Sequence, residues 1–186
     1  MEKNDSAGKI LTIPNALTLV RFLLVGVMAY LFLQDEPVWA MAVYLAAAAT
    51  DLIDGYIARK FNQISNLGKV MDPIADKLMT VTALVCMFLQ QYLTTTVLIV
   101  VIAKEALMIV GGVLIYFVFK KVVYANLYGK IAAAAYFLAI MLLFLHNYVA
   151  PYDAYFMYLA VAMNVVSMFQ YGYINIVMEY RKKREG

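Results

Sequence analysis

Long apolar runs, separated by short polar segments, follow one another along most of this chain. Each run is close to the ~20 residues that an α-helix needs to cross the hydrocarbon of a bilayer. The pattern predicts six transmembrane helices, near residues 16–33, 38–57, 73–89, 94–116, 129–147 and 152–174. We expect the third to begin at Pro73, with Asp72 as its N-cap. The polar segment 1–13 is expected to lie at the membrane interface.

The composition also indicates an all-α integral membrane protein. Hydrophobic residues make up 65% of the 186 residues, and only 15% are charged, whereas a soluble domain has about 25% charged residues. Six helices of this length use nearly the whole chain, so we expect one transmembrane domain over residues 1–186. The net charge of +3 is too small to indicate a nucleic-acid partner, and membrane lipids are the expected surroundings.

Basic residues gather on one side of the predicted topology. Lysines and arginines occur in loops 58–72 and 117–128 and in both terminal segments. The connections 34–37, 90–93 and 146–153 contain none. The positive-inside rule therefore predicts cytoplasmic termini, which requires an even number of spans. His146, near the outer end of the fifth predicted span, is expected to be interfacial rather than catalytic.

Four aspartates interrupt the apolar pattern at the cytoplasmic ends of the second and third predicted helices. They belong to the pattern Asp51-x2-Asp54-Gly55-x2-Ala58-Arg59-x8-Gly68-x3-Asp72-x3-Asp76. Spacings of three and four residues place each pair on one helical face. Because loop 58–72 returns the chain to the same side of the membrane, we expect the two faces to oppose each other. Ionised acids are costly at membrane depth, which favours a functional role.

Four opposed carboxylates would repel one another strongly unless cations were bound. Hard oxygen ligands favour Mg²⁺, Mn²⁺ or Ca²⁺ over zinc, and a pair of such ions is the usual device for displacement at phosphorus. The sequence thus predicts a phosphate-handling metal site at Asp51, Asp54, Asp72 and Asp76. Ion-coupled transport is an alternative use of intramembrane acids, although the chain lacks the repeated halves typical of such transporters.

Small and basic residues surround the aspartates in the same motif. Gly55, Ala58 and Gly68 leave space for a ligand near the ions, although small residues in membrane helices also serve helix packing. Arg59 and Lys69 can contact phosphate oxygens, the arginine through a bidentate fork and the lysine as a point charge. These five residues are the predicted binding site for a nucleotide-phosphate substrate.

The motif matches a known family. Its pattern is the signature of the CDP-alcohol phosphatidyltransferases, D-x2-D-G-x2-A-R-x8-G-x3-D-x3-D, at every position. The segment 13–21 and the segment 72–77 resemble those of bacterial phosphatidylglycerophosphate synthases and of eukaryotic-type cardiolipin synthases. The resemblance is clear over about the first 80 residues and looser beyond them.

This resemblance implies a six-helix enzyme, usually a homodimer, in a bacterial plasma membrane, with a polar cavity open to the cytoplasm. It implies transfer of a phosphatidyl group from CDP-diacylglycerol to a glycerol-type alcohol, with release of CMP, using two divalent ions, Mg²⁺ or Mn²⁺. Asp51, Asp54 and Asp72 would be metal ligands, and Asp76 would contribute to the metal site and act as general base. Gly55, Ala58, Gly68 and Arg59 would border the CDP-lipid.

The acceptor alcohol is less clearly indicated. Glycerol 3-phosphate carries a dianionic phosphate and requires a basic pocket, for which Arg21, Lys104 and Lys130 are candidates. Lys104 lies near the middle of the fourth predicted span, where an unpaired ammonium is costly. Pairing with Glu105 or an aspartate is its alternative role. Lys130 could instead extend its ammonium group to the interface.

Two segments depart from typical phosphatidylglycerophosphate synthases. Those enzymes have Ala-Arg-Glu with a second arginine further on, and a Gly-Lys-x-Lys-Thr segment. This chain has Ala103-Lys104-Glu105 followed by Gly111-Gly112, and Gly129-Lys130-Ile131-Ala132-Ala133. The two missing cations favour the alternative of a cardiolipin synthase that uses phosphatidylglycerol as acceptor. We favour glycerol 3-phosphate because three basic groups remain and this acceptor is the commoner one for the opening segment.

Overall fold

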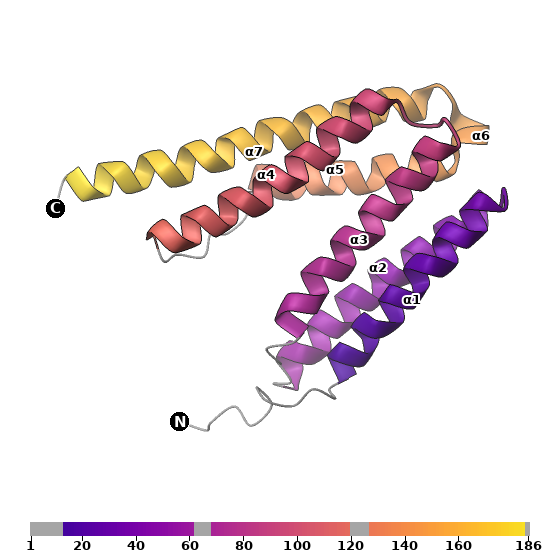
Figure 1. Cartoon of the computed structure of the whole chain (residues 1–186), viewed down its shortest axis with the longest axis horizontal. Helices are drawn as coiled ribbons and strands as arrows, with labels where there is room; N and C mark the ends of the chain where they lie inside the picture. Colours follow the sequence, from indigo (N-terminus) through magenta and orange to yellow (C-terminus); the bar gives the residue numbers. More distant parts are fainter. Residues whose placement is uncertain (1–12, 62–67, 120–126, 185–186) are drawn as a thin grey trace. The chain divides into compact units, whose positions relative to one another are not determined.

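The computed structural model describes residues 13–61, 68–119 and 127–184, and over these residues it is helical without any strand (Figure 1). The helices are α1 (Ile13–Leu33), α2 (Pro37–Lys60), α3 (Gly68–Leu89), α4 (Thr95–Phe119), α5 (Leu127–Phe144), α6 (His146–Val149) and α7 (Tyr152–Arg184). Each of the six predicted spans overlaps one long helix, so the all-α prediction is confirmed. The short helix α6 was not predicted.

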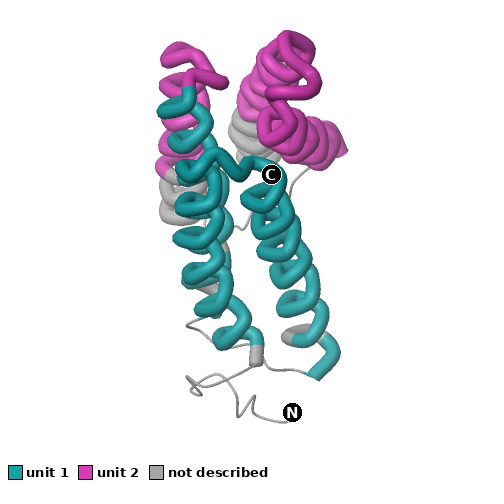
Figure 2. The backbone as a smooth tube through the Cα atoms, turned by 90° about the vertical axis from the view of Figure 1, so that its right-hand side faces the viewer, with its two compact units in different colours: residues 1–90 teal, residues 91–186 magenta. Residues whose placement is uncertain are grey.

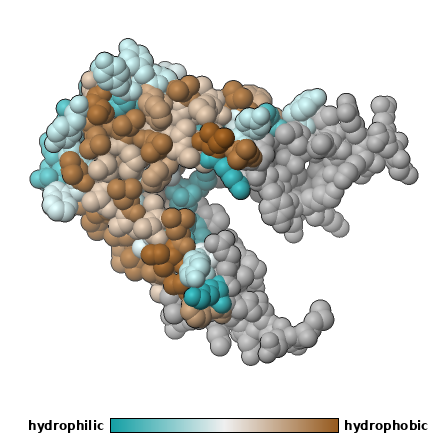
Figure 3. Space-filling view, turned by 180° about the vertical axis from the view of Figure 1, so that it is seen from behind, coloured by the Kyte–Doolittle hydropathy of each residue, from teal (hydrophilic) through white to brown (hydrophobic). Residues whose placement is uncertain are grey.

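The helices carry the apolar exterior of a membrane protein. Within the described residues, α1, α2 and α5 contain segments long and apolar enough to cross a membrane: Pro14–Leu33, Pro37–Ile57 and Leu127–Phe144. Large apolar side chains on these helices are exposed; Leu23 and Leu52, for example, are 72% and 74% exposed. Apolar surface spreads over much of the coloured area in Figure 3. Lipid is a suitable solvent for such a surface, and water is not.

The start of α3 differs from the prediction. The helix begins at Gly68, five residues before Pro73, so Asp72 lies inside the helix instead of capping it. Proline lacks an N–H group and removes one backbone hydrogen bond from a helix interior. Here this cost falls in the second turn and does not end the helix. Asp72 and Asp76 are therefore held one helical turn apart on continuous helix.

Residues 1–90 form one compact unit (Figure 2), in which α1 packs along both α2 and α3. Contacts between α2 and α3 are few by comparison. The fully buried apolar residues of this unit include Met28, Ala40, Ala47, Leu84 and Met87. Alanines allow close approach of membrane helices, whose association depends on packing. Helix α1 is thus the element that connects the two helices carrying the aspartates.

Residues 91–186 form the second unit, in which α7 packs against α5 and α4. The most deeply buried side chains are Ile140, Leu143, Phe144, Met157 and Ala160. Asn164 of α7 donates its Nδ2 hydrogens to the carbonyl oxygen of Ala132 in α5, at 2.8 Å, and to that of Ala160, at 3.0 Å. This amide joins the two helices through hydrogen bonds to backbone carbonyl oxygens of both.

A histidine–aspartate pair joins α6 to the start of α7 in the second unit. Nδ1 of His146 lies 2.6 Å from Oδ2 of Asp153, whose side chain is completely buried in the first turn of α7. The ring of Tyr92 stacks on the imidazole with 4.2 Å between centroids, and its hydroxyl lies 3.4 Å from Oδ1 of Asn147. The contacts tie α6 to α7 and to the segment before α4.

We expect Asp153→Asn to lower the free energy of unfolding by about 1–2 kcal/mol, because a buried charge-assisted bond to His146 becomes a neutral one. Thermal melting in detergent would measure the loss. Asp35→Asn is the matched control, since Asp35 is exposed and its contact with Gln90 is long, 3.4 Å. Equal melting temperatures for the two variants would contradict a stabilising role for the pair.

Candidate active site

Parts of three helices meet at the aspartate motif. Asp51 and Asp54 lie near the C-terminal end of α2, and Asp72 and Asp76 lie in the first turns of α3. Helix α1 contributes Thr18 and Arg21, which are three residues apart and therefore on one helical face. One residue of this face contacts the α2 aspartates and the other contacts α3.

Arg21 is shared between the two aspartates of α2. Its Nη2 donates to Oδ2 of Asp54, and its Nη1 lies 2.7 Å from Oδ1 of Asp51. The arginine side chain is 2% exposed and the Asp54 side chain 3%, whereas that of Asp51 is 46% exposed. A single buried guanidinium thus compensates the buried charge of Asp54, which would otherwise be very costly, and also pairs with the half-buried Asp51.

Thr18 makes the corresponding contact with α3. Its hydroxyl oxygen lies 2.5 Å from Oδ1 of Asp72 and 3.0 Å from the carbonyl oxygen of Pro14. The one hydroxyl hydrogen serves one acceptor at a time, and the charged carboxylate is the stronger acceptor. Thr18 was not among the predicted site residues; its position one turn before Arg21 was the available signal.

The charges and hydrogen-bond donors around Arg21 are not fully balanced by partners. Asp72 and Asp51 both repel the Asp54 carboxylate electrostatically, while Arg21 attracts it. Among these four side chains, negative charge exceeds positive charge. Within the described part of the chain, Nε of Arg21 is buried without a hydrogen-bond partner, whereas Nη1 is paired with Asp51. The cluster therefore has an excess of negative charge and one unsatisfied buried donor.

The four aspartates differ in burial. Asp54 is buried, Asp51 and Asp72 are half-buried, and Asp76 is exposed. The most buried carboxylate is the one held by Arg21, and the most exposed one lies a turn further along α3. This order places Asp76 where a proton can be exchanged with a ligand or with solvent.

The remaining motif residues flank the aspartates. Gly55, half-buried, follows Asp54 in α2, and Gly68, buried, is the first residue of α3. Ala58, Arg59 and Lys69 lie in helical backbone, but their side chains fall outside the described residues. Their predicted contacts with a CDP-lipid remain predictions.

The three predicted acceptor residues occupy different settings. Arg21 lies on the aspartates, as described above. Lys104 is 7% exposed, with its Nζ 2.5 Å from Oε1 of Glu105 and 5.6 Å from the ring centroid of Tyr136. Lys130 is exposed in the first turn of α5. Pairing with Glu105 was one of the two predicted roles for Lys104, and both lysines belong to the second unit.

The donor chemistry of the cluster suits a hard divalent ion, because its ligands are carboxylate oxygens. Across residues 13–61, 68–119 and 127–184, however, no three acidic, histidine or cysteine side chains are grouped closely enough to hold an ion. Arg21 lies between the oxygens of Asp51 and Asp54 that such an ion would bind. The carboxylates have the chemistry that the predicted ions require. In this structure the cation that contacts Asp51 and Asp54 is the Arg21 guanidinium.

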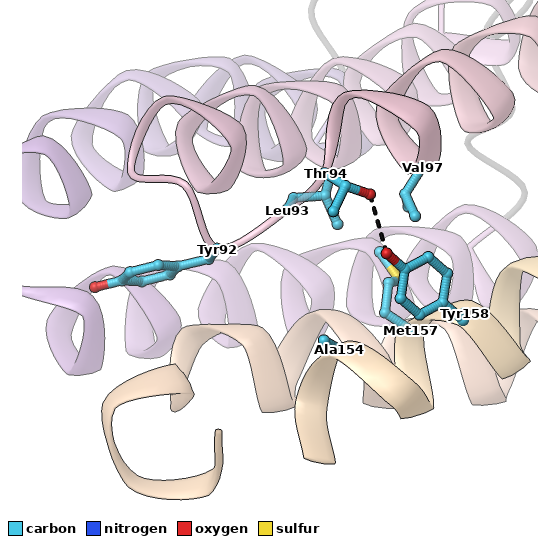
Figure 4. A pocket seen from close by; sticks show the side chains of 7 residues that line it. All are labelled: Tyr92, Leu93, Thr94, Val97, Ala154, Met157 and Tyr158. Atoms are coloured by element: carbon cyan, nitrogen blue, oxygen red, sulfur yellow. Dashed lines mark hydrogen bonds between the residues drawn. The ribbon is translucent and has the colours of Figure 1, made fainter. Parts of the chain in front are cut away.

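Two hollows in the second unit are not lined by any motif residue. One, of about 20 Å³, lies beside the hydrogen bond of 3.2 Å between the hydroxyls of Thr94 and Tyr158 (Figure 4). It has room for about one water molecule. The other, of about 350 Å³, lies between α5 and α7 and is lined mainly by apolar side chains, with Tyr128 and Gln170 among its lining residues.

Comparison with known proteins gives the family. The model of the CDP-alcohol phosphatidyltransferase family matches residues 11–166. The chain is 32% identical over 179 residues to the CDP-diacylglycerol--glycerol-3-phosphate 3-phosphatidyltransferase of Bacillus subtilis strain 168, covering 86% of this chain and 92% of that protein. It is 37% identical over 90 residues to a CMP-forming cardiolipin synthase of Streptomyces coelicolor, covering 45% of this chain and 42% of the relative.

A third relative is a fusion of CMP-forming cardiolipin synthase with a mitochondrial hydrolase from Schizosaccharomyces pombe, 43% identical over 82 residues. That match covers 44% of this chain and 14% of the fusion protein. The chain therefore spans less than half of the length of two of these three relatives. It belongs to the CDP-alcohol phosphatidyltransferase family. The predicted resemblance is confirmed, and the membership favours a transferase over an ion-coupled transporter.

We expect Thr18→Val to lower the stability of the metal-free protein by about 1 kcal/mol, because Asp72 loses a hydrogen-bond donor while the side-chain volume is kept. Thermal melting in EDTA would measure the change. Thr50→Val is the matched control: its hydroxyl donates only to the carbonyl oxygen of Ala47 in its own helix, at 2.7 Å. A larger loss for the Thr50 variant would contradict the importance of the α1–α3 contact.

Proposed function

We propose that this protein transfers the phosphatidyl group of CDP-diacylglycerol to glycerol 3-phosphate, giving phosphatidylglycerophosphate and CMP. The proposal rests mainly on one observation: three motif aspartates contact Thr18 and Arg21, which lie one turn apart on α1, in a chain of this family. Carboxylates gathered beside a buried arginine suit a substrate that brings phosphate together with divalent cations.

Support for glycerol 3-phosphate comes from the Bacillus subtilis relative. Its name specifies that acceptor, and the match to it extends over 86% of this chain and 92% of its own length. The matches to the Streptomyces coelicolor and Schizosaccharomyces pombe cardiolipin synthases extend over less than half of this chain.

In the proposed reaction, Asp76 accepts the proton of the acceptor hydroxyl. The hydroxyl oxygen bonds to the phosphorus that carries the diacylglycerol, and the bond from that phosphorus to the oxygen bridging it to the cytidine phosphate breaks. The bridging oxygen leaves as part of CMP. The exposure of Asp76, in contrast to buried Asp54, supports this role, because a general base must reach the substrate proton.

Asp51, Asp54, Asp72 and Asp76 would hold two divalent ions, Mg²⁺ or Mn²⁺. When bound, such ions would neutralise charge on the diphosphate and on the departing CMP. Gly55, Ala58 and Gly68 would leave room for the cytidine diphosphate, and Arg59 and Lys69 would bind its phosphate oxygens. Arg21, Lys104 and Lys130 are the proposed ligands of the acceptor.

The proposal includes a single six-span domain over residues 1–186, in a bacterial plasma membrane and with cytoplasmic termini. Long helices at all six predicted positions and the family match to residues 11–166 support it. A homodimer is proposed on the family resemblance.

One observation favours phosphatidylglycerol as the acceptor instead. Glu105 neutralises Lys104, and Asp51 and Asp54 neutralise Arg21, so only exposed Lys130 among the three acceptor candidates has no ion pair described. Phosphatidylglycerol carries one negative charge on its phosphodiester, whereas glycerol 3-phosphate carries two. An acceptor site with little uncompensated positive charge fits the former better, and the product would be cardiolipin.

CMP release by the purified protein in detergent with Mg²⁺ would separate the two acceptors. We expect release from CDP-diacylglycerol to require glycerol 3-phosphate, and to stop in EDTA and resume with Mg²⁺ or Mn²⁺. Release that requires phosphatidylglycerol would establish the second candidate. No release with either acceptor, in protein that melts cooperatively, would reject both.

We expect Asp76→Asn to retain the fold and to lower kcat by about 10²–10⁴-fold, because an amide cannot accept the hydroxyl proton. The rate of CMP release at saturating acceptor, together with the melting temperature, would check this. Asp35→Asn, an exposed acid in the connection between α1 and α2, should keep full activity. Substantial turnover by the Asp76 variant would exclude this residue as the base.

A further inference from the structure

Arg21 is the least expected member of the site, because it occupies the carboxylate oxygens proposed for metal binding. Its two terminal nitrogens contact Oδ1 of Asp51 and Oδ2 of Asp54. A carboxylate oxygen that is shared with a guanidinium is a poor ligand for a divalent ion, since the two cations repel each other at such range. Arginine and metal therefore compete for the same atoms.

We propose that Arg21 is an exchangeable counter-ion: it pairs with Asp51 and Asp54 when divalent ions are absent, and it leaves them to bind substrate phosphate when such ions take its place. This inference rests on the proposed function. Arg21 would contact the aspartates first and the substrate phosphate afterwards, so metal binding would promote substrate binding.

The burial of Arg21 requires a second anionic partner. Its side chain is 2% exposed, and an unpaired cation at such a position is strongly disfavoured. A guanidinium does not become neutral by losing a proton inside a protein. If Arg21 leaves the carboxylates, it must therefore contact another anion. Phosphate oxygens match the planar fork of a guanidinium.

The buried Nε of Arg21 agrees with this exchange. It makes no hydrogen bond in the described part of the chain, whereas Nη1 and Nη2 are paired with the two carboxylates. A guanidinium fixed permanently in a structural ion pair would be expected to have its donors satisfied, because each unsatisfied buried donor is costly. An unsatisfied donor beside an excess of carboxylate charge suits a group that is shared among several anions.

The neighbouring contact of α1 supplies the fixed point for such a movement. Thr18, one turn before Arg21, holds Asp72 through its hydroxyl and lies within hydrogen-bond distance of the Pro14 carbonyl. Helix α1 is thus attached to α3 independently of Arg21. A change of partner by the arginine side chain requires no movement of the helix.

Mn²⁺ binding to the substrate-free protein tests the competition. Titration followed by electron paramagnetic resonance would compare wild type with Arg21→Gln and Arg21→Lys. We expect Arg21→Gln to bind Mn²⁺ about tenfold more tightly, because its competitor is gone. Arg21→Lys should bind a few-fold more tightly, since lysine keeps the charge but cannot fork between two carboxylates.

Lys60→Gln is the charge control. Lys60 is exposed at the end of the same helix as the aspartates, with its Nζ 5.3 Å from the ring centroid of Tyr56. It loses the same charge without touching the carboxylates, so Mn²⁺ affinity should stay within twofold of wild type. Arg21→Gln is purified in Mg²⁺, because its carboxylates lack a partner otherwise, and Arg21→Lys provides the test that retains a cation throughout.

Glycerol 3-phosphate, the acceptor assigned to Arg21 above, tests the second half of the exchange. In saturating Mg²⁺, it should bind both Arg21 variants at least several-fold more weakly than wild type. Unchanged Mn²⁺ affinity in both variants would overturn the competition, and so would an increase matched by Lys60→Gln. Tighter Mn²⁺ binding with unchanged affinity for glycerol 3-phosphate would overturn the transfer to phosphate. Failure of the wild type to release CMP would reject the proposed function and leave the Mn²⁺ result standing.

Discussion

The ion pairs of Arg21 with Asp51 and Asp54 are the interaction on which the first unit depends. Charges buried among membrane helices must be paired, and this requirement selects one arrangement from the many that apolar packing permits. Asp54 and Arg21 are both almost completely buried, so their contact favours the register in which α1 and α2 meet. The contact between Thr18 and Asp72 then fixes α3 against the same face of α1.

Much of the helical architecture could be predicted from sequence, because each long apolar run has few alternatives to a helix. Helix contacts could not be predicted in the same way. In a membrane, residues facing lipid and residues facing other helices are both apolar. The position of Thr18 one turn before Arg21 could indicate that it belongs to the site, but not that it meets Asp72, which is 54 residues away. The start of α3 was wrongly predicted because one missing hydrogen bond at Pro73 is too small a cost to end a helix that already includes Gly68.

In the candidate site, too, the helices and their residues could be predicted from the sequence, but the contacts between side chains could not. Its aspartates were evident from their spacing, and the structure confirms that all four lie on helices. The charge balance was not evident, since it depends on which cation reaches which carboxylate. Arg21 and Lys104 are each paired with carboxylates in the structure. The number of basic residues therefore does not give the positive charge that is available to an acceptor. Specificity for a singly or doubly charged acceptor would depend on which of these residues can exchange its carboxylate partner for the acceptor phosphate.

The length of α7 has a consequence for the membrane surface. Its 33 residues correspond to about 50 Å of helix, against a hydrocarbon thickness of about 30 Å. In the proposed topology, Asp153, in the first turn of α7, would lie at the outer side of the membrane. From there the helix is long enough to cross the bilayer and continue for about 20 Å beyond its apolar layer. The basic run 181–184 would then stand on a rigid stem at the level of the lipid headgroups and the adjoining cytoplasm, where anionic lipids concentrate.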